Sequence, residues 1–349
     1  MTKLIANWLL ECGIPAIQYQ TWNKLHDAAG SENVFRNDLI CCADTQRLFN
    51  YGTATGNEIR FQNVHGATNR QTENILPMLL DRGLDNTFPE VDEICGPILK
   101  NCFIPQFPDT HCFHWFPPII LVPLLLWAGY RDKALLDWYH WRLDLVSGFC
   151  KKMDFDIFAE DGTYKGIPKP FWDRRVIRPC LYQNGAIQLP MIYDLYGYRA
   201  MYGEASPEER DKINTVLSYI MSDPYQQIPR GYGLLRESPS HYYAMGWDAV
   251  LPRCEDGSLT AQALHRMELL SKFPCAVSSP WFQENLALVM ACRREDGRFL
   301  LPKAALQEKE SVWVLGGHMG LGENRRKKDW SILVGTFRVY RMLAEIENK

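Results

Sequence analysis

The stretch PIILVPLLLWAGYRDKALLDWYHWRLDLVSGF (118–149) joins two kinds of helix and decides the fold class. Residues 118–129 are apolar on every side, which is typical of a helix surrounded by protein. Residues 132–149 instead place apolar side chains at helical spacing on one face and leave the other face polar. A buried helix followed by a surface helix is therefore the structural unit that this stretch predicts.

The same pairing recurs along the chain, with no low-complexity linker between the pairs. Pro15 and Pro207 suit a first helical turn, and Gly83 suits a position just after a helix. Ser206 and Glu209 have the spacing of a capping box. Alternation of period two is nearly absent, so we expect an all-α chain. Further helices are predicted at 6–12, 15–28, 67–85, 88–101, 182–203, 206–222, 258–273, 279–294 and 328–347.

Alternating buried and surface helices indicate an inner ring of helices enclosed by an outer ring. An open α-solenoid also alternates its helices, but its repeats keep a fixed length, whereas the spacings here are irregular. We therefore expect an α/α toroid, with inner and outer rings of antiparallel helices, that forms a single domain over residues 1–349.

The bulk composition disfavours several classes of protein. The chain is 46% hydrophobic and 23% charged with a formal net charge of −3, and its one basic run, RRKK (325–328), is typical of a solvated loop. We expect no nucleic-acid partner. The longest apolar run is far shorter than the roughly 20 residues of a membrane span. The 11 scattered cysteines, without a secretory signal, predict reduced thiols and a cytoplasmic location. The oligomeric state is left open.

In a toroid the N-termini of the inner helices meet at one end, so the segments before them would line the mouth of the central cavity. These segments are 64–74, 108–118, 178–186, 238–249, 278–285 and 327–331. Their imidazoles, carboxylates and aromatic rings suit a small-molecule substrate. The predicted catalytic residues are Asp109, His111, His114 and His65, and the predicted substrate-binding residues are Trp115, Tyr182, His241, Tyr243, Trp247, Asp248, Trp281, Asp329 and Trp330.

Each of these residues also has a structural interpretation. Asp, Ser and Asn residues before helices are commonly N-caps, which would account for Asp109 or Asp329. A single histidine beside apolar neighbours is more often a core residue than a catalyst. The segment GGHMGLG (316–322) follows no strand, so we interpret it as a flexible connection before the last helix and not as a dinucleotide loop.

A metal ion is the alternative use of the segment 108–118. Asp109, His111, Cys112 and His114 have the ligand chemistry of a zinc site, to which Cys102 and His65 could add. No second pair of histidines or cysteines at ligand spacing completes the site. We therefore predict no metal or other cofactor and keep zinc as the alternative.

Four segments together resemble bacterial proteins of the squalene cyclase and prenyltransferase superfamily. They are WLLECGIPAIQYQTW (8–22), EDGTY (160–164), EDGRF (295–299) and WVLGGHMGLG (313–322). The two EDG segments resemble the DG-x-W type motif of that superfamily, with Tyr and Phe in place of Trp. The resemblance implies an α/α barrel of the terpenoid cyclase type.

The catalytic motifs of that superfamily are only partly present. A class II cyclase protonates an alkene with an aspartate of a D-x-D-D motif, because an alkene is a feeble base. The nearest segment is DFDI (154–157), which has Asp154 and Asp156 but Ile157 at the fourth position. The Asp, Cys and His ligands of a zinc-dependent prenyltransferase have no counterpart at a matching spacing.

Three hypotheses about function follow. The first is an enzyme that binds a hydrophobic or aromatic small molecule, such as an isoprenoid, and performs acid–base cyclisation or isomerisation. In it the rings of Tyr182, Tyr243, Trp247 and Trp330 shape the pocket and stabilise a cation. The second is a carbohydrate-active α/α-barrel hydrolase or lyase with two facing carboxylates. The third is a non-catalytic module that binds a partner.

Overall fold

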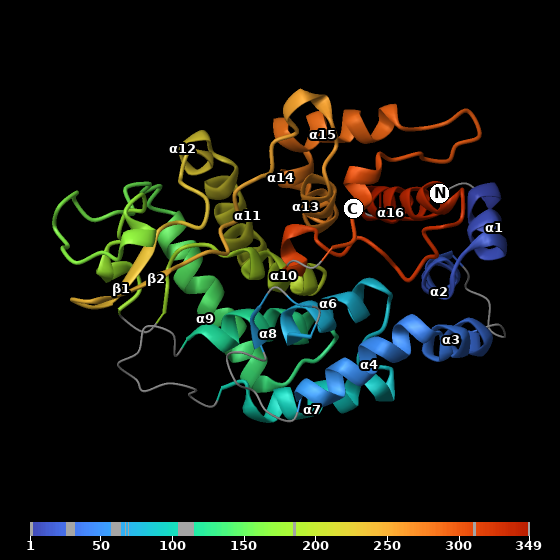
Figure 1. Ribbon diagram of the computed structural model, residues 1–349, viewed down its shortest axis with the longest axis horizontal. Helices are drawn as coiled ribbons and strands as arrows, with labels where there is room; N and C mark the ends of the chain where they lie inside the picture. The colour runs from blue at the N-terminus through green and yellow to red at the C-terminus, as the bar shows by residue number, and fades with distance from the viewer. Residues whose placement is uncertain are drawn as a thin grey trace. The chain divides into compact units, whose positions relative to one another are not determined.

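A computed structural model describes residues 3–25, 32–56, 64–66, 68, 70–103, 115–183, 186–309 and 312–347 (Figure 1). The chain folds as two compact units. The terminal unit comprises Met1–Lys100, Trp127–Gly129 and Pro252–Lys349, and the central unit comprises Asn101–Leu126 and Tyr130–Leu251. The single domain that the sequence predicts stays a prediction.

The described residues are mostly helical, as the sequence predicts, with one small hairpin. The hairpin pairs β1 (Leu234–Ser238) with β2 (His241–Ala244) in antiparallel register. The α-helices, in chain order, are α1 (Lys3–Cys12), α2 (Pro15–Leu25), α3 (Glu32–Cys41), α4 (Ala43–Gly56), α6 (Thr72–Asp81), α7 (Pro89–Asn101), α8 (Phe116–Trp127), α9 (Lys133–Cys150), α10 (Ile192–Met201), α11 (Pro207–Met221), α12 (Asp223–Gln226), α13 (Ala261–Leu270), α14 (Pro274–Val277), α15 (Pro280–Ala291) and α16 (Trp330–Glu347).

Buried and half-buried helices alternate along the chain. All ten residues of α6 are buried, and so is α8 from Phe116 to Leu126. Helices α10, α13 and α16 are also buried over most of their length. By contrast, α7, α9, α11 and α15 bury only one face each. This alternation confirms the two kinds of helix that the sequence predicts.

Several predicted helix ends are confirmed by their local hydrogen bonds. The Ser206 hydroxyl accepts from the Glu209 amide, and the Glu209 carboxylate accepts from the Ser206 amide, which is the expected capping box. Helix α2 begins at Pro15. Gly83 follows the last turn of α6 and has a φ of 89°, a left-handed conformation that favours glycine.

Other boundaries differ from the prediction. The helix expected over 182–203 begins only at Ile192. The carbonyls of Ile187 and Leu189, which lie before it, accept hydrogen bonds from the Arg142 guanidinium, so they are held in a loop. Helices α3 and α4 and the hairpin were not predicted. Strand β2 lies within the segment 238–249, which was expected to lead directly into a buried helix.

Hydrogen bonds hold the GGHMGLG segment in place, whereas the sequence predicts a flexible connection here. The Glu308 carboxylate bonds His318 Nδ1 at 2.8 Å and accepts from the Gly320 amide at 2.8 Å. A Cβ at position 320 would lie only 2.5 Å from Glu308 Oε2, so a larger residue there would displace this carboxylate. Burial opposes ionisation of Glu308, but its interactions with His318, the Gly320 amide and Arg325 together outweigh burial and lower the pKa of the carboxyl.

A buried network of charges joins four helices of the terminal unit. Arg338 of α16 bonds Asp81 of α6 at 2.6 Å and Glu268 of α13 at 2.8 Å. Arg341, one turn along α16, bonds the same two carboxylates at 2.7 and 3.0 Å. Gln20 of α2 donates to the Asp81 carbonyl at 2.9 Å. Each charge therefore has an opposite partner, as burial requires.

The network also determines how nearby groups titrate. Burial raises the pKa of Asp81, but the adjacent Arg338 and Arg341 outweigh it and lower that pKa below its ordinary value. His265 lies in the same buried region, with its ring 4.2 Å from the Trp313 ring. Burial, helped by the positive charge of Arg338, lowers the pKa of His265 to about 3.

The central unit has its own buried ion pair. Arg142 of α9 binds Asp194 of α10 through two bonds of 2.8 Å, and Asp194 also accepts from the Met191 amide. Several buried tyrosines lie in the same unit, and the hydroxyls of two of them, Tyr225 and Tyr232, bond each other at 2.6 Å. These contacts fix α10 to its neighbours within the unit.

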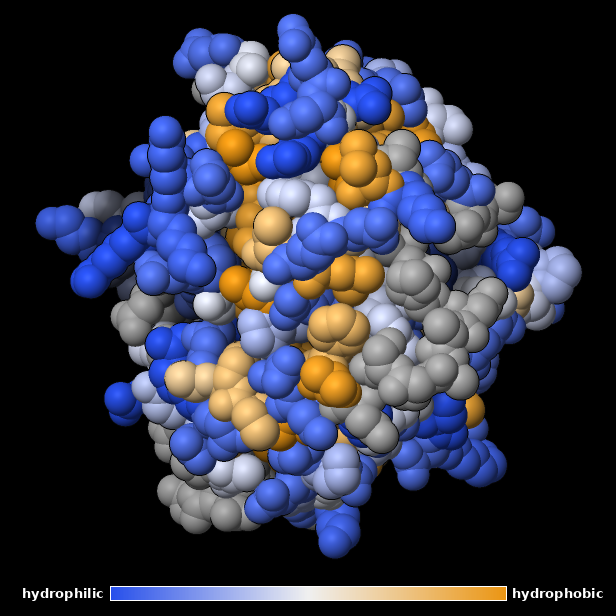
Figure 2. All heavy atoms as spheres, turned by 90° about the vertical axis from the view of Figure 1, so that its right-hand side faces the viewer, coloured by the Kyte–Doolittle hydropathy of each residue, from blue (hydrophilic) through white to orange (hydrophobic). Residues whose placement is uncertain are grey.

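On the face drawn in Figure 2, hydrophilic residues predominate and hydrophobic ones are interspersed among them. Leu4 and Val34 are exposed large hydrophobic side chains of the terminal unit. Scattered exposed hydrophobic residues are normal on a protein surface and require no special explanation.

Replacement of Arg338 should strongly destabilise the fold. In Arg338→Met, two buried carboxylates would keep only Arg341 as a cation, so we expect a loss of about 3–5 kcal/mol in the free energy of unfolding. Urea denaturation measures this loss. The matched control is Lys133→Met, which breaks the exposed Lys133–Asp137 pair and should cost at most about 0.5 kcal/mol. Equal losses for the two variants would refute the role of the network.

The low pKa of His265 predicts that stability falls in mild acid. The unfolded chain binds a proton at this histidine below pH ~6.5, whereas the folded chain binds it only near pH 3, so stability decreases as pH falls through this window. Between pH 8 and pH 5 the contribution of His265 to this loss is about 2 kcal/mol.

His265→Gln should remove that part of the pH dependence, and urea denaturation at pH 8 and pH 5 measures the difference. The control is His241→Gln, because His241 is exposed on β2 and should contribute little. A wild-type pH dependence in His265→Gln would contradict the assignment.

Candidate functional site

A histidine–carboxylate pair lies at the start of the buried helix α6. His65 precedes the helix, and its Nδ1 lies 2.6 Å from Oε1 of Glu73, which is fully buried. The Gly66 amide donates to the same oxygen at 2.7 Å. A carboxylate at this position is favoured by the positive end of the helix dipole. The side chain of His65 is 28% exposed, so the pair joins a buried carboxylate to an accessible imidazole.

The loop that carries His65 is folded back onto the helix by Asn74. The Asn74 side-chain amide donates to the carbonyls of Gly66 and Thr68 at 2.8 and 2.7 Å. Its oxygen accepts from the backbone amide of Trp313 at 2.7 Å. Asn74 is fully buried, so these bonds also satisfy its polar atoms. The loop, α6 and the short 3-10 helix η5 (Trp313–Leu315) are thereby fixed together.

Aromatic side chains lie next to this anchor within the terminal unit. The Trp313 ring packs against His265 at 4.2 Å and against Trp127 at 5.4 Å between centroids. Trp313 is buried, whereas Trp127 is half-buried. The aromatic cluster is thus linked to the first turn of α6 through the backbone amide of Trp313.

This arrangement can perform proton transfer. A carboxylate can only accept hydrogen bonds, so a neutral His65 that bonds the Glu73 carboxylate carries its proton on Nδ1. The neutral imidazole then has its lone pair on Nε2, which is the form that serves as a general base. The carboxylate would also stabilise the imidazolium that forms when His65 takes a proton.

The predicted catalytic residues are only partly described. His65 lies in the terminal unit with the partners given above. Asp109, His111 and His114 lie outside the described residues, as does Cys112 of the alternative zinc site. Within the described part of the chain, no group of three or more histidine, cysteine, aspartate or glutamate side chains is placed to hold a metal ion.

The predicted substrate-binding residues of the terminal unit make structural contacts. Trp281 donates its indole N–H to the Pro252 carbonyl at 2.7 Å. The Trp330 ring lies 4.5 Å from the guanidinium carbon of Arg325. Asp329 is exposed just before α16.

Two tyrosines and a histidine predicted for substrate binding lie near the hairpin of the central unit. The Tyr182 hydroxyl accepts from the Arg236 amide at 2.8 Å and donates to the Arg236 carbonyl at 3.1 Å. Tyr243 donates to Glu237, and His241 Nδ1 lies 2.8 Å from the Ser238 hydroxyl. These polar groups fix strands and loops.

The remaining three predicted residues of the central unit are buried, pack against another ring, or accept hydrogen bonds from the backbone. Trp115 is buried just before α8. Trp247 has a positive φ of 57° and packs its ring 4.3 Å from that of Phe116. Asp248 accepts from the amides of Gly231 and Val250 at 2.8 and 2.9 Å.

The first aspartate of the DFDI segment is held by an arginine and a backbone amide. Asp154 accepts from Arg178 at 2.6 Å and from the Asp156 amide at 3.0 Å. The EDG segments at 160–162 and 295–297 both form turns in which the glycine has a φ of 82°.

Sequence reasoning missed the residues that hold His65. Glu73 and Asn74 stand in the first turn of an apolar helix, where acidic and amide side chains are ordinarily interpreted as caps. The available signal was that both would be buried if the helix is apolar on all sides. Trp313 is more than 200 positions away, so no local pattern links it to them.

The bonds of Glu73 predict the tautomer of His65. In the wild type at pH 8, ¹⁵N NMR should find the proton on Nδ1 and an unprotonated Nε2, because Glu73 Oε1 accepts. Glu73→Gln can place its side-chain NH₂ toward His65 and should shift the population toward the Nε2–H form. His318 bonds Glu308 and serves as an internal reference in both spectra. An Nε2–H tautomer of His65 in the wild type would exclude the proposed base.

In comparisons with protein-family models, with curated proteins and with solved structures, nothing matched the chain. Among the described helices, none is both long enough and apolar enough to cross a membrane.

Proposed function

We propose that the chain is an enzyme of the α/α-toroid type that binds a hydrophobic or aromatic small molecule and performs acid–base chemistry on it. The observation that carries the proposal is the His65–Glu73 pair, with an accessible imidazole bonded to a fully buried carboxylate. The alternation of buried and half-buried helices supports the toroid, because inner and outer rings would produce it. The two EDG turns support the resemblance to terpenoid cyclases.

The chemistry of the pair favours isomerisation over cyclisation that begins with alkene protonation. An imidazolium is too weak an acid to protonate an alkene efficiently, whereas a neutral imidazole abstracts an activated proton well. Asp154, the first aspartate of the DFDI segment, is paired with Arg178. The proposed reaction is therefore abstraction of a carbon-bound proton by Nε2 of His65, followed by return of a proton at another carbon.

The roles predicted from the sequence for Asp109, His111, His114 and the aromatic residues stay predictions. The proposed reaction rests on His65 and its partner Glu73. A carbohydrate-active enzyme would need two carboxylates that face a cleft. The closely placed pair Asp81 and Glu268 is buried and bonded to two arginines, which disfavours that alternative for these two residues.

Solvent deuterium provides a test that works with any substrate of this reaction class. Purified protein is incubated in D₂O with an extract of small molecules. The products are then separated, and their molecular masses are measured by mass spectrometry. Proton abstraction with return from solvent should add deuterium to one metabolite. His65→Asn should slow this incorporation by about 10²–10⁴-fold, the ordinary contribution of a general base.

The matched control is His140→Asn. His140 also bonds a glutamate, Glu209, at 2.9 Å, but it lies on the surface of α9 with 48% of its side chain exposed. This variant should incorporate deuterium at the wild-type rate. Incorporation that is unchanged in His65→Asn, with the fold intact by circular dichroism, would remove His65 from the catalytic set. An absence of incorporation in the wild type would refute the proposed proton abstraction.

A further inference from the structure

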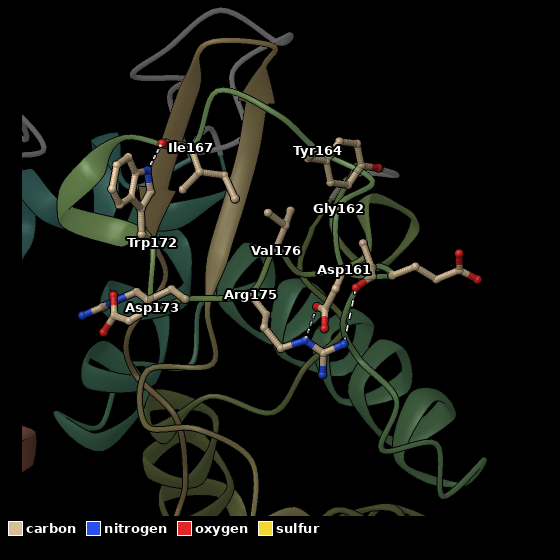
Figure 3. A pocket seen from close by; sticks show the side chains of 11 residues that line it. Asp161, Gly162, Tyr164, Ile167, Trp172, Asp173, Arg175 and Val176 are labelled. Carbon is tan, nitrogen blue, oxygen red and sulfur yellow. Dashed lines mark hydrogen bonds and ion pairs between the residues drawn. The ribbon is translucent and has the colours of Figure 1, made fainter.

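The central unit has a pocket of about 350 Å³ that is separate in sequence from the His65 site. Its lining residues lie between Ala159 and Val176, in the connection from α9 to α10 (Figure 3). The volume is at the small end of the range for ligand sites. The EDG turn, at residues 160–162, forms one side of the pocket.

An exposed tryptophan forms the opposite side. Trp172 is 70% exposed, yet its indole N–H donates to the Ile167 carbonyl at 2.8 Å. This bond restrains the orientation of an exposed apolar ring. In Figure 3 the indole and the Asp161 carboxylate lie on opposite sides of the pocket. The ring therefore offers an open, oriented face to a ligand.

The pocket combines an apolar base with polar walls. Val176 is buried against Leu234 and Tyr242 of the hairpin, and Ile167 packs against the same cluster. Asp161 and Arg175, which bond each other at 3.1 Å, supply hydrogen-bonding groups. Gly162, with a φ of 82°, leaves open space where a Cβ would stand. A ligand with one apolar face and several polar edges fits these walls.

The charges of the pocket disfavour an anionic ligand. Its lining holds three carboxylates and two guanidinium groups. Arg175 is bonded to Asp161, and the Arg174 guanidinium lies 5.9 Å from the centroid of the Phe171 ring. A phosphate would meet more negative than positive charge, so a nucleotide is disfavoured. Neutral hydroxyl groups can donate to carboxylates and accept from guanidinium groups at no electrostatic cost.

We propose that this pocket binds a neutral pyranose unit of a carbohydrate. One face of the sugar would stack on the Trp172 indole, because the polarised C–H bonds of a pyranose are attracted to the negative face of an aromatic ring. Its hydroxyls would bond the remaining donor and acceptor positions of Arg175 and Asp161. This inference concerns a binding site in the central unit and does not rest on the proposed reaction at His65.

A glycan array with the full chain, followed by NMR titration of the indole N–H signals with the best-ranked neutral glycan, tests the proposal. The signal that disappears in Trp172→Phe assigns Trp172. We expect this signal to shift on titration, and we expect Trp172→Ala to weaken binding at least tenfold. Because Trp172 is exposed, the variant should keep its fold, which the remaining indole signals report.

The control is Trp141→Ala, which removes another exposed tryptophan of the central unit, on α9. It should bind the glycan with wild-type affinity. Capture of no neutral glycan, or equal affinity in Trp172→Ala and the wild type, would overturn the proposal. AMP is titrated in parallel, and a shift of the Trp172 signal with AMP alone would identify a nucleotide site instead and would also overturn it.

Discussion

The terminal unit depends on the buried network of Asp81, Glu268, Arg338 and Arg341. These residues come from α6, α13 and α16, so the network can form only when the three helices have one mutual arrangement. Removal of either partner from a buried pair leaves an uncompensated charge, which is more costly than the loss of an apolar contact. The charges therefore specify how the helices pack, in addition to any stability they contribute.

The same constraint positions the candidate site. Asp81 ends α6, and Glu73 and Asn74 stand at its beginning, so the network fixes one end of the helix that carries the site on the other. Asn74 then attaches η5 and the His65 loop to that helix. An imidazole that must transfer a proton needs a fixed partner and a fixed orientation. Both come from bonds to a helix that is buried along its entire length.

The sequence predicts much of the fold and little of the site. Helical class, many helix positions and the alternation of buried with half-buried helices follow from periodicity, and Ser206, Pro15 and Gly83 mark their ends through local chemistry. Helix α10 begins later than predicted because Arg142, far away in sequence, binds the carbonyls before it. Likewise, the sequence predicts His65 as a site residue. Its partner Glu73, however, stands in the first turn of a helix, where an acidic side chain is ordinarily interpreted as a cap. Long-range bonds such as Asn74–Trp313 leave no local pattern.

Native-state hydrogen exchange tests most directly whether the network and the site form one cooperative structure. The amides of Gly66 and Trp313 donate to Glu73 and Asn74 of α6. The account predicts that these two amides exchange with the same opening free energy as the core amides of α6, α13 and α16, because they open only when α6 is released. Opening free energies several kcal/mol lower for Gly66 and Trp313 would contradict it, because the site would then open independently of the helix that positions it.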